Sequence, residues 1–197
     1  LTTHKVYGEA MGVLSGVTLL NYAYETMFRA FELTDDKDRV IRAVRIMAEK
    51  TGIYGMLGGQ SVDVENDGKP LEKDLLDYIY EHKTSALIEA SMMVGAALAG
   101  ASEAEIKVIE DSARDIGLAF QIRDDILDVT STTDELGKPV FSDEKNDKTT
   151  YVTIEGIEKA KSDVEEISKR AVSALQSLDR KNDFLEELVL MLVNRKK

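Results

Sequence analysis

The sequence predicts an all-α protein, and three observations support that fold class. Two prolines and no tryptophan stand against many Ala, Leu, Glu and Lys residues, a composition that favours helices. Apolar residues recur at spacings of three and four, which places them on one face of a helix. Capping signals precede several of these runs. The 197 residues contain no repeat, low-complexity segment or linker, so we expect a single domain over 1–197.

Each predicted helix follows from this pattern. Thr34 to Asp36 is a cap signal for the second helix, Pro70 opens the third, and Ser102 with Glu105 forms a capping box for the fourth. The spacing of apolar residues by three and four then predicts helices over residues 5–33, 36–56, 70–99, 103–129, 153–178 and 184–193. The basic end, 195–197, suits a helix C-terminus and predicts no function of its own.

The composition excludes several classes of protein. A formal net charge of −12 argues against a general nucleic-acid-binding protein and against binding to anionic membranes. The most apolar run, residues 91–102, is shorter than the roughly 18 residues that a membrane span needs, so no integral membrane segment is expected. The absence of cysteine excludes disulfides and thiolate sites and fits a cytoplasmic protein.

The chemistry centres on residues 120–128, FQIRDDILD. The apolar stripe that passes through Phe120 continues by fours onto Asp124 and Asp128, with Asp125 beside them and Gln121 one turn earlier. A solvated acidic face is the alternative interpretation. Unpaired carboxylates on an inward stripe would cost several kcal/mol each, so a cation should meet them. Oxygen ligands without His or Cys suit Mg²⁺, which takes one or two carboxylates plus substrate phosphates, and this predicts a phosphate-bearing substrate.

Positive charge that could meet such a substrate occurs in two places. Lys83 and Thr84 lie in mid-helix, where a local backbone distortion could free donors for phosphate; His82 is read as a satisfied side chain. Lys138 and Lys148 lie in the loop predicted over 130–151, which could equally be a solvated charged loop. Residues 58–63, GGQSVD, predict either a close helix contact or a lining of the site.

These motifs resemble the trans-isoprenyl diphosphate synthases, especially bacterial farnesyl and geranylgeranyl diphosphate synthases. The similarity covers nearly the whole chain, and its strings occur in the family's order. They are THKVYGEAM, GMLGGQSVD, HKTSALI, FQIRDDILD, and GKP with NDKTTY.

The resemblance implies the isoprenoid synthase helical bundle, usually a homodimer, and a short-chain prenyltransferase. Such an enzyme condenses an allylic diphosphate with isopentenyl diphosphate after magnesium-assisted ionisation, here to farnesyl diphosphate or alternatively to geranylgeranyl diphosphate. By the same resemblance, the ligands of Mg²⁺ are Asp124, Asp125 and Asp128. The residues that contact the diphosphate are Lys83, Lys138 and Lys148. The residues near the allylic cation are Thr84 and Gln121, and with Lys83 these form the expected catalytic set.

The chain also departs from the family pattern. The first aspartate-rich motif should precede Leu1, and Val17 stands where the family has an aspartate. Phe141 and Asp147 stand where glycines are common. We therefore also weigh a truncated or non-catalytic subunit, a terpene cyclase, which would release free diphosphate, and a purely structural helical bundle.

Overall fold

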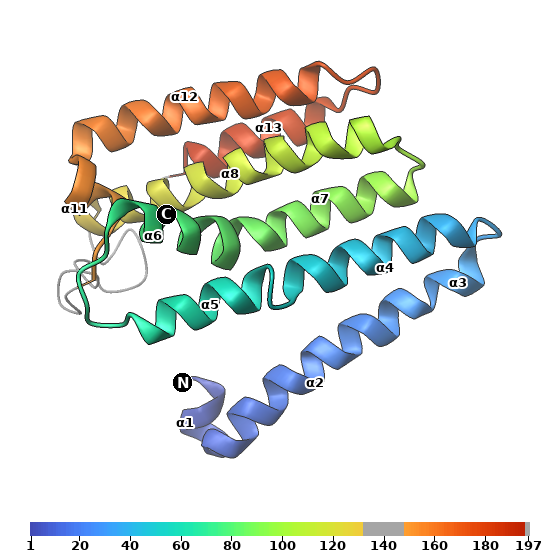
Figure 1. Ribbon diagram of the computed structural model, residues 1–197, viewed down its shortest axis with the longest axis horizontal. Coiled ribbons are helices and arrows are strands. Elements are labelled where there is room, and N and C mark those ends of the chain that lie inside the picture. The colour runs from blue at the N-terminus through green and yellow to red at the C-terminus, as the bar shows by residue number, and fades with distance from the viewer. Residues whose placement is uncertain (132–147, 196–197) are drawn as a thin grey trace.

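The computed structural model describes residues 1–131 and 148–195, and within these ranges every regular element is a helix (Figure 1). The all-α prediction is therefore confirmed. None of these helices is both long and apolar enough to cross a membrane. In chain order they are α1 (Thr3–Tyr7), α2 (Glu9–Phe28), α3 (Ala30–Leu33), α4 (Lys37–Thr51), α5 (Met56–Glu65), α6 (Lys73–Ile79), the π-helix η1 (Tyr80–Ser85), α7 (Ala86–Leu98), α8 (Glu103–Thr130), α11 (Tyr151–Glu155), α12 (Ile157–Gln176) and α13 (Asp183–Val193).

Two predicted caps are present and begin the helices that matter most for the core. The Asp36 side chain accepts from the Arg39 amide at 3.3 Å and starts α4. Ser102 and Glu105 form the reciprocal capping box of α8: the Ser102 hydroxyl accepts from the Glu105 amide at 3.3 Å, and the Glu105 carboxylate accepts from the Ser102 amide at 2.7 Å. Both satisfy backbone donors that a helix start leaves without intrahelical partners.

The predicted helices are divided where the backbone turns. The helix expected over 5–33 breaks at Gly8, whose φ of +88° is a conformation that favours glycine. The helix expected over 36–56 ends at Thr51, and α5 begins at Met56. The helix expected from Pro70 begins three residues later, at Lys73, and its middle turn is π-helical. Residues before 157 form the separate helix α11, which Gly156 (φ +81°) ends.

Helix α8 is the centre of the core. It lies between α12 and α13 on one side and η1 with α7 on the other (Figure 1). Ile122 and Ile126 pack with Leu76, Val164 and other buried residues of α6, η1, α11, α12 and α13. Nearer its start, Ile106 packs with residues of α4 and α7. One helix therefore carries both the apolar core and the aspartate stretch.

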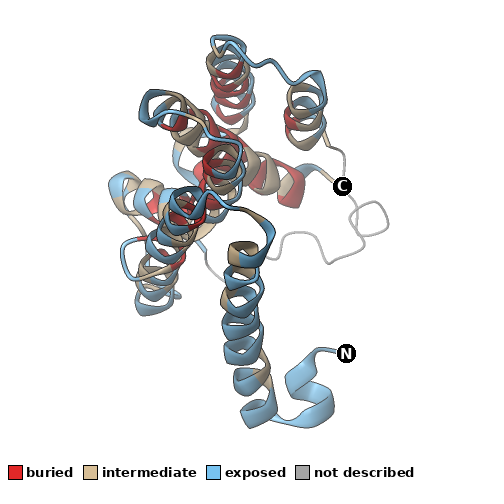
Figure 2. Ribbon diagram, turned by 90° about the vertical axis from the view of Figure 1, so that its right-hand side faces the viewer, coloured by how far each residue is buried: buried red, intermediate tan, exposed pale blue. Residues whose placement is uncertain are grey.

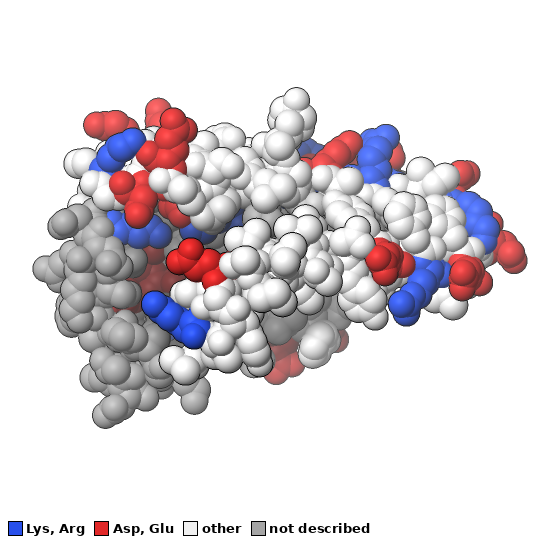
Figure 3. Space-filling model, turned by 90° about the horizontal axis from the view of Figure 1, so that it is seen from below, with Lys and Arg blue, Asp and Glu red and all other residues white. Residues whose placement is uncertain are grey.

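Helices α1, α2 and α3 contain no buried residue and lie apart from the core (Figure 2). Large apolar side chains on α2 are nonetheless exposed to solvent. They are Met11, Val13, Leu14, Val17, Leu19, Leu20, Tyr22 and Phe28, which we call the α2 face. Seen from the side on which α2 lies, the middle of the molecule carries few charges (Figure 3).

Candidate active site

The π-helical turn η1 is held between α5 and α8 by two glycines. A Cβ at Gly59 of α5 would lie 2.3 Å from the backbone nitrogen of Lys83. A Cβ at Gly117 of α8 would lie 2.5 Å from the Cα of Ser85. Both distances are too short for any side chain, so only glycine lets the three backbones approach this closely. The close-contact interpretation of the glycines near residue 59 is confirmed.

The π-helical turn confirms the local distortion that the sequence suggested around Lys83 and Thr84. Single π-helical turns inside α-helices are frequent at functional sites, because the wider turn redirects side chains and frees backbone groups. Here the turn directs Lys83 to α5, where its Nζ donates to Asp63 Oδ2 at 2.5 Å. Lys83 is therefore held beside α5 and stays partly exposed, with 34% of its side-chain surface accessible.

A chain of hydrogen bonds joins η1 to the aspartate stretch. The Thr84 hydroxyl donates to Gln121 Oε1 at 3.1 Å, and Gln121 Nε2 donates to Asp125 Oδ1 at 3.3 Å. The other oxygen of Asp125 accepts from the Tyr80 hydroxyl at 2.5 Å and from the Tyr151 amide at 2.9 Å. We call Thr84, Gln121, Asp125, Tyr80 and the Tyr151 amide the Asp125 network. It joins the predicted site residue Thr84 to two others, Gln121 and Asp125, that lie about forty positions later in the chain.

The segment before α11 is fixed to the same place. Thr150 caps α11, and the Thr149 hydroxyl accepts from the Leu71 amide at 3.0 Å. Lys148 precedes them and is exposed, three residues from the amide that reaches Asp125. The structure thus brings Lys148 to the end of the molecule that holds Asp125. Lys138, Phe141 and Asp147 lie outside the described residues.

Asp124 points to a different neighbour from Asp125. Its Oδ1 lies 3.3 Å from Nη2 of Arg195, whose guanidinium also stands over the Phe120 ring at 3.7 Å. Burial lowers the pKa of Arg195, although Asp124 opposes the shift. The interpretation of this arginine as a helix-end charge without further function is therefore incomplete. No spacing in the sequence relates residues 124 and 195, so periodicity could not reveal this contact.

The donor set suits magnesium shared with a phosphate ligand. Over residues 1–131 and 148–195, no group of three His, Cys, Asp or Glu side chains is arranged to hold a metal ion alone. Asp124 and Asp128 are four residues apart on α8 and so share one face. Two carboxylates match what Mg²⁺ takes when substrate phosphates complete its coordination. Both oxygens of Asp125 instead accept hydrogen bonds from protein groups.

A partly buried ionic cluster joins α4, α7 and α8 around the buried carboxylate of Glu89. Lys50 pairs with Glu89 and, at 2.6 Å, with Glu110. Burial alone would lower the pKa of Lys50, but hydrogen bonds from the ammonium to Glu110 and Glu89 outweigh it and raise that pKa. Arg114 reaches the other oxygen of Glu89 at 3.7 Å. We call these four residues the Lys50 cluster.

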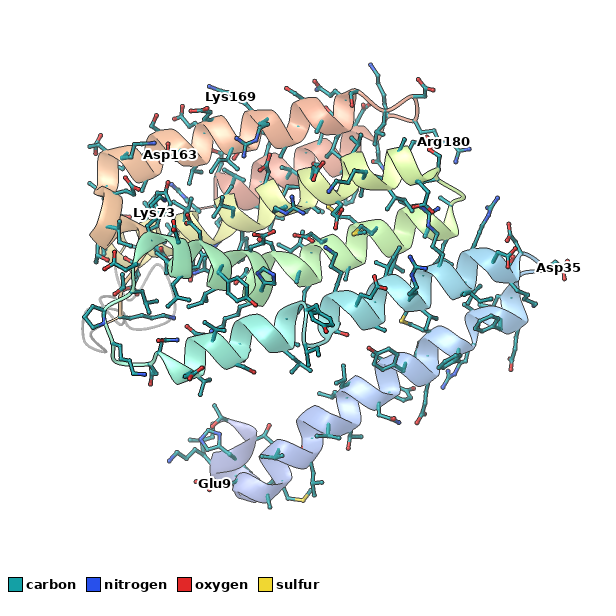
Figure 4. All side chains as sticks on the ribbon, viewed as in Figure 1. Glu9, Asp35, Lys73, Asp163, Lys169 and Arg180 are labelled. Carbon is teal, nitrogen blue, oxygen red and sulfur yellow. The ribbon has the colours of Figure 1, made fainter. Side chains whose placement is uncertain are left out.

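A second polar cluster connects α11 to α12. The Tyr151 hydroxyl donates to Asp163 Oδ2 at 2.7 Å, and Lys73 stands 4.5 Å from the Tyr151 ring centroid. Figure 4 shows Lys73 and Asp163 at the same end of the molecule. Burial and the bond to Asp163 raise the pKa of Tyr151 well above its usual value, so the phenol remains protonated.

The sequence matches the model of a known protein family over most of its length. The model of the family described as "Polyprenyl synthetase" matches residues 1–188. The chain belongs to the polyprenyl synthetase family. Geranylgeranyl pyrophosphate synthase 4 of Arabidopsis thaliana is 40% identical over 181 residues, covering 90% of this chain and 48% of that protein. Farnesyl diphosphate synthase of Geobacillus stearothermophilus is 39% identical over 165 residues, covering 81% of this chain and 54% of that protein.

Solved members of the family have the same fold. A geranyltransferase from Helicobacter pylori, complexed with magnesium and isoprenyl diphosphate, superposes with a TM-score of 0.81 at 30% identity, over 98% of this chain and 62% of that one. A geranylgeranyl pyrophosphate synthetase from Pyrococcus horikoshii gives 0.85 at 27% identity, over 98% and 69%. The isoprenoid synthase fold is therefore confirmed. The chain spans about half the length of the curated relatives it matches.

Proposed function

We propose that this chain carries the diphosphate-binding half of a short-chain prenyltransferase site. The observation that supports it most is the Asp125 network, which joins the π-helical turn bearing Lys83 and Thr84 to α8. On the same helix, Asp124 and Asp128 offer two carboxylates on one face. A site that joins cationic side chains, a metal-binding acid pair and a polar oxygen suits ionisation of an allylic diphosphate.

Each residue has a role that follows from its chemistry. Asp124 and Asp128 would hold magnesium through their carboxylates, and Lys83 and Lys148 would bind diphosphate oxygens. When bound, magnesium would neutralise the charge that develops on the leaving diphosphate. The Gln121 carbonyl oxygen and the Thr84 hydroxyl would face the allylic carbon as it becomes positive. Apolar residues around α8 would keep water from that carbon until isopentenyl diphosphate reacts.

The test is a prenyl-transfer assay with isopentenyl diphosphate, geranyl diphosphate and magnesium. We expect a longer prenyl diphosphate as product, and we expect Asp124→Ala to lower turnover by about 100-fold or more, because it removes a metal ligand. The matched control is Asp35→Ala, an exposed aspartate in the turn before α4. Near-normal turnover by the Asp124 variant would contradict the proposal.

Product length distinguishes two forms of this proposal. We propose farnesyl diphosphate, in agreement with the Geobacillus relative, which is named a farnesyl diphosphate synthase. The plant relatives are named geranylgeranyl synthases instead. Chromatographic separation of the assay products by chain length decides between a product of fifteen carbons and one of twenty.

We also propose that the chain assembles as a homodimer through the α2 face. Only two of the twenty residues of α2 are charged, and none is buried. A helix apolar on most of its surface is one that another surface covers, and the free energy of that burial favours association. Sedimentation velocity should show a dimer, and Leu19→Gln with Leu20→Gln should shift it towards monomer, whereas Ser15→Gln at an already polar position should not. A wild-type monomer at high micromolar concentration would contradict the homodimer.

A second candidate function has a specific observation in its favour. One relative is named the large subunit of a heterodimeric geranylgeranyl pyrophosphate synthase, and it is 40% identical over 200 residues. A non-catalytic or truncated subunit would use the same α2 face to bind a catalytic partner. A folded protein that forms no product in the transfer assay and shows no magnesium-dependent binding of diphosphate would favour this role, whereas clear stoichiometric binding of diphosphate would count against it.

A further inference from the structure

Asp125 lies between the two proposed metal ligands in sequence, and its described partners differ from those of Asp124, which lies beside Arg195. It is 3% exposed, and the described groups that reach it are all hydrogen-bond donors. Oδ2 accepts from the Tyr80 hydroxyl and the Tyr151 amide, and Oδ1 accepts from Gln121 Nε2. Tyr80 is itself 5% exposed and opens η1. An ionised carboxylate accepts only, so it suits three donors and imposes a direction on each.

We infer that Asp125 and Tyr80 are positioning residues that fix the amide orientation of Gln121, and that Asp125 is not a metal ligand. This inference rests on the proposed function, because it concerns the group that would face the allylic cation. Since Asp125 can only accept, the Gln121 atom nearest to it is the NH₂ group. The carbonyl oxygen then faces Thr84 and η1, at 3.1 Å from the Thr84 hydroxyl.

The orientation matters because the two ends of an amide have opposite partial charges. Turned as the structure has it, Gln121 offers a partially negative oxygen on the side of Lys83 and Thr84. Turned by 180°, it would offer an NH₂ group, which repels a developing positive charge. The carboxylate of Asp125 therefore acts on the reaction through Gln121, without contacting the substrate.

Tyr80 contributes by holding the carboxylate itself. The final torsion of an aspartate is broad and roughly two-fold, so it does not fix the carboxylate plane alone. The phenol at 2.5 Å and the Tyr151 amide at 2.9 Å together hold Oδ2, which leaves Oδ1 directed at Gln121. Without the phenol, Oδ2 would lose one of its two donors among the described residues and keep the neutral Tyr151 amide, and the contact with Gln121 would loosen.

The affinities for two substrate analogues show whether Asp125 and Tyr80 position Gln121 or only stabilise the fold. Geranyl thiolodiphosphate has the diphosphate and the apolar chain but no positive charge. An ammonium analogue of the same length has a protonated nitrogen where the carbon would become cationic. Both would use the same lysines and magnesium, so the ratio of their dissociation constants reports the charge that Gln121 presents. General damage to the fold would weaken both ligands together.

Two substitutions test the inference by different routes. Tyr80→Phe removes the phenol and keeps the ring. Asp125→Asn keeps the shape, and its carbonyl oxygen can still accept from Tyr80 and Tyr151. Its NH₂ group then faces the Gln121 NH₂ group, which forces Gln121 to turn round. The introduced asparagine amide would not turn round in place of Gln121, because its NH₂ group would then face the Tyr80 hydroxyl and the Tyr151 amide, which are both donors. The control is Tyr78→Phe, two residues earlier and stacked on His82 at 4.0 Å.

The measurement is calorimetric titration of the full chain and each variant with both ligands in excess magnesium. We expect Tyr80→Phe and Asp125→Asn to weaken the ammonium analogue by about fivefold to tenfold, to leave the thiolodiphosphate within about twofold, and Tyr78→Phe to change neither. Equal effects on both ligands in the Asp125 variant would overturn the positioning role alone. No binding of either ligand by the wild-type chain would overturn the proposed function, and this inference with it.

Discussion

Helices α8 and α2 are both long and both rich in apolar residues, yet their surroundings are opposite. Of the 28 residues of α8, eleven are buried, including Asp125 and Asp128. Of the 20 residues of α2, none is buried, although only Glu9 and Glu25 are charged. The apolar face of α8 packs on both sides against other helices of the chain, whereas the α2 face meets solvent.

The difference shows that apolar content alone does not determine burial within a chain. On α8 the apolar residues lie on faces that neighbouring helices cover, and Gly117 allows η1 to approach closely. On α2 the apolar residues surround most of the helix, which is typical of a helix that another surface covers. Comparable substitutions should therefore have large effects on stability in α8 and small ones in α2.

The largest loss of stability should come from replacing Gly117, the α8 glycine that lets η1 pack closely. Gly117→Ala would place a Cβ 2.5 Å from the Cα of Ser85, so two backbones must separate, and we expect a loss of more than about 3 kcal/mol in the free energy of unfolding. Gly16→Ala is the matched control on α2, because a Cβ there meets nothing within 4 Å. It should raise stability by up to about 1 kcal/mol. Urea denaturation measures both, and equal losses would remove the contrast between the two helices.

A smaller effect is expected from the Lys50 cluster. Lys50→Met leaves the buried Glu89 and the partly buried Glu110 without their shared cation. Losing one partner of a fully buried pair costs about 3–5 kcal/mol, and because Lys50 is 21% exposed we expect about 2–3 kcal/mol. Lys169→Met on α12 is the control (Figure 4), since its pair with Glu165 is exposed and should contribute less than about 0.5 kcal/mol. Thermal unfolding that gave equal losses would contradict the cluster's role.

The smallest change in stability should come from replacing Asp163, and its size should depend on pH. Burial alone would raise the pKa of this carboxyl, but hydrogen bonds from Lys159 and Tyr151 outweigh it and hold that pKa below its ordinary value. The stability it contributes is therefore present above the pKa of an unfolded aspartate, about 3.9, and is lost as pH falls through the lower folded value. Asp163→Asn should destabilise the protein at neutral pH, and the difference from wild type should narrow below about pH 4. A constant difference from pH 7 to pH 2.5 would contradict this assignment.

Much of the fold follows from local signals. The capping box at Ser102 predicted the start of α8, and the apolar rhythm predicted the helices of the core. The sequence did not reveal the break at Gly8, because a glycine in an apolar run shows no sign of its φ angle. It did suggest a distorted turn at Lys83 and Thr84, but not that Gly59 and Gly117 hold the turn from two sides, since that depends on three helices meeting.

The site was predicted less completely than the fold. The spacing of Phe120, Asp124 and Asp128 predicted that both acids face inward; Asp128 is buried, but the Asp124 side chain keeps 40% of its surface exposed, so the prediction was wrong for Asp124. The resemblance named Thr84 and Gln121, which lie in contact. Neither route indicated Tyr80 or Arg195, whose partners lie 45 and 71 positions away. The three acids of the string DDILD look equivalent in the sequence. Only the neighbours that packing supplies distinguish Asp125 from Asp124.

The proposed function requires α8 to carry a magnesium-dependent diphosphate site. The direct measurement is calorimetric titration of the chain with inorganic diphosphate, with and without magnesium, beside Asp124→Asn and the control Asp35→Asn. We predict binding that requires magnesium, that is weakened at least about tenfold by Asp124→Asn, and that is unchanged by Asp35→Asn. Diphosphate binding that is equally tight without magnesium, or that is indifferent to Asp124, would contradict the claim.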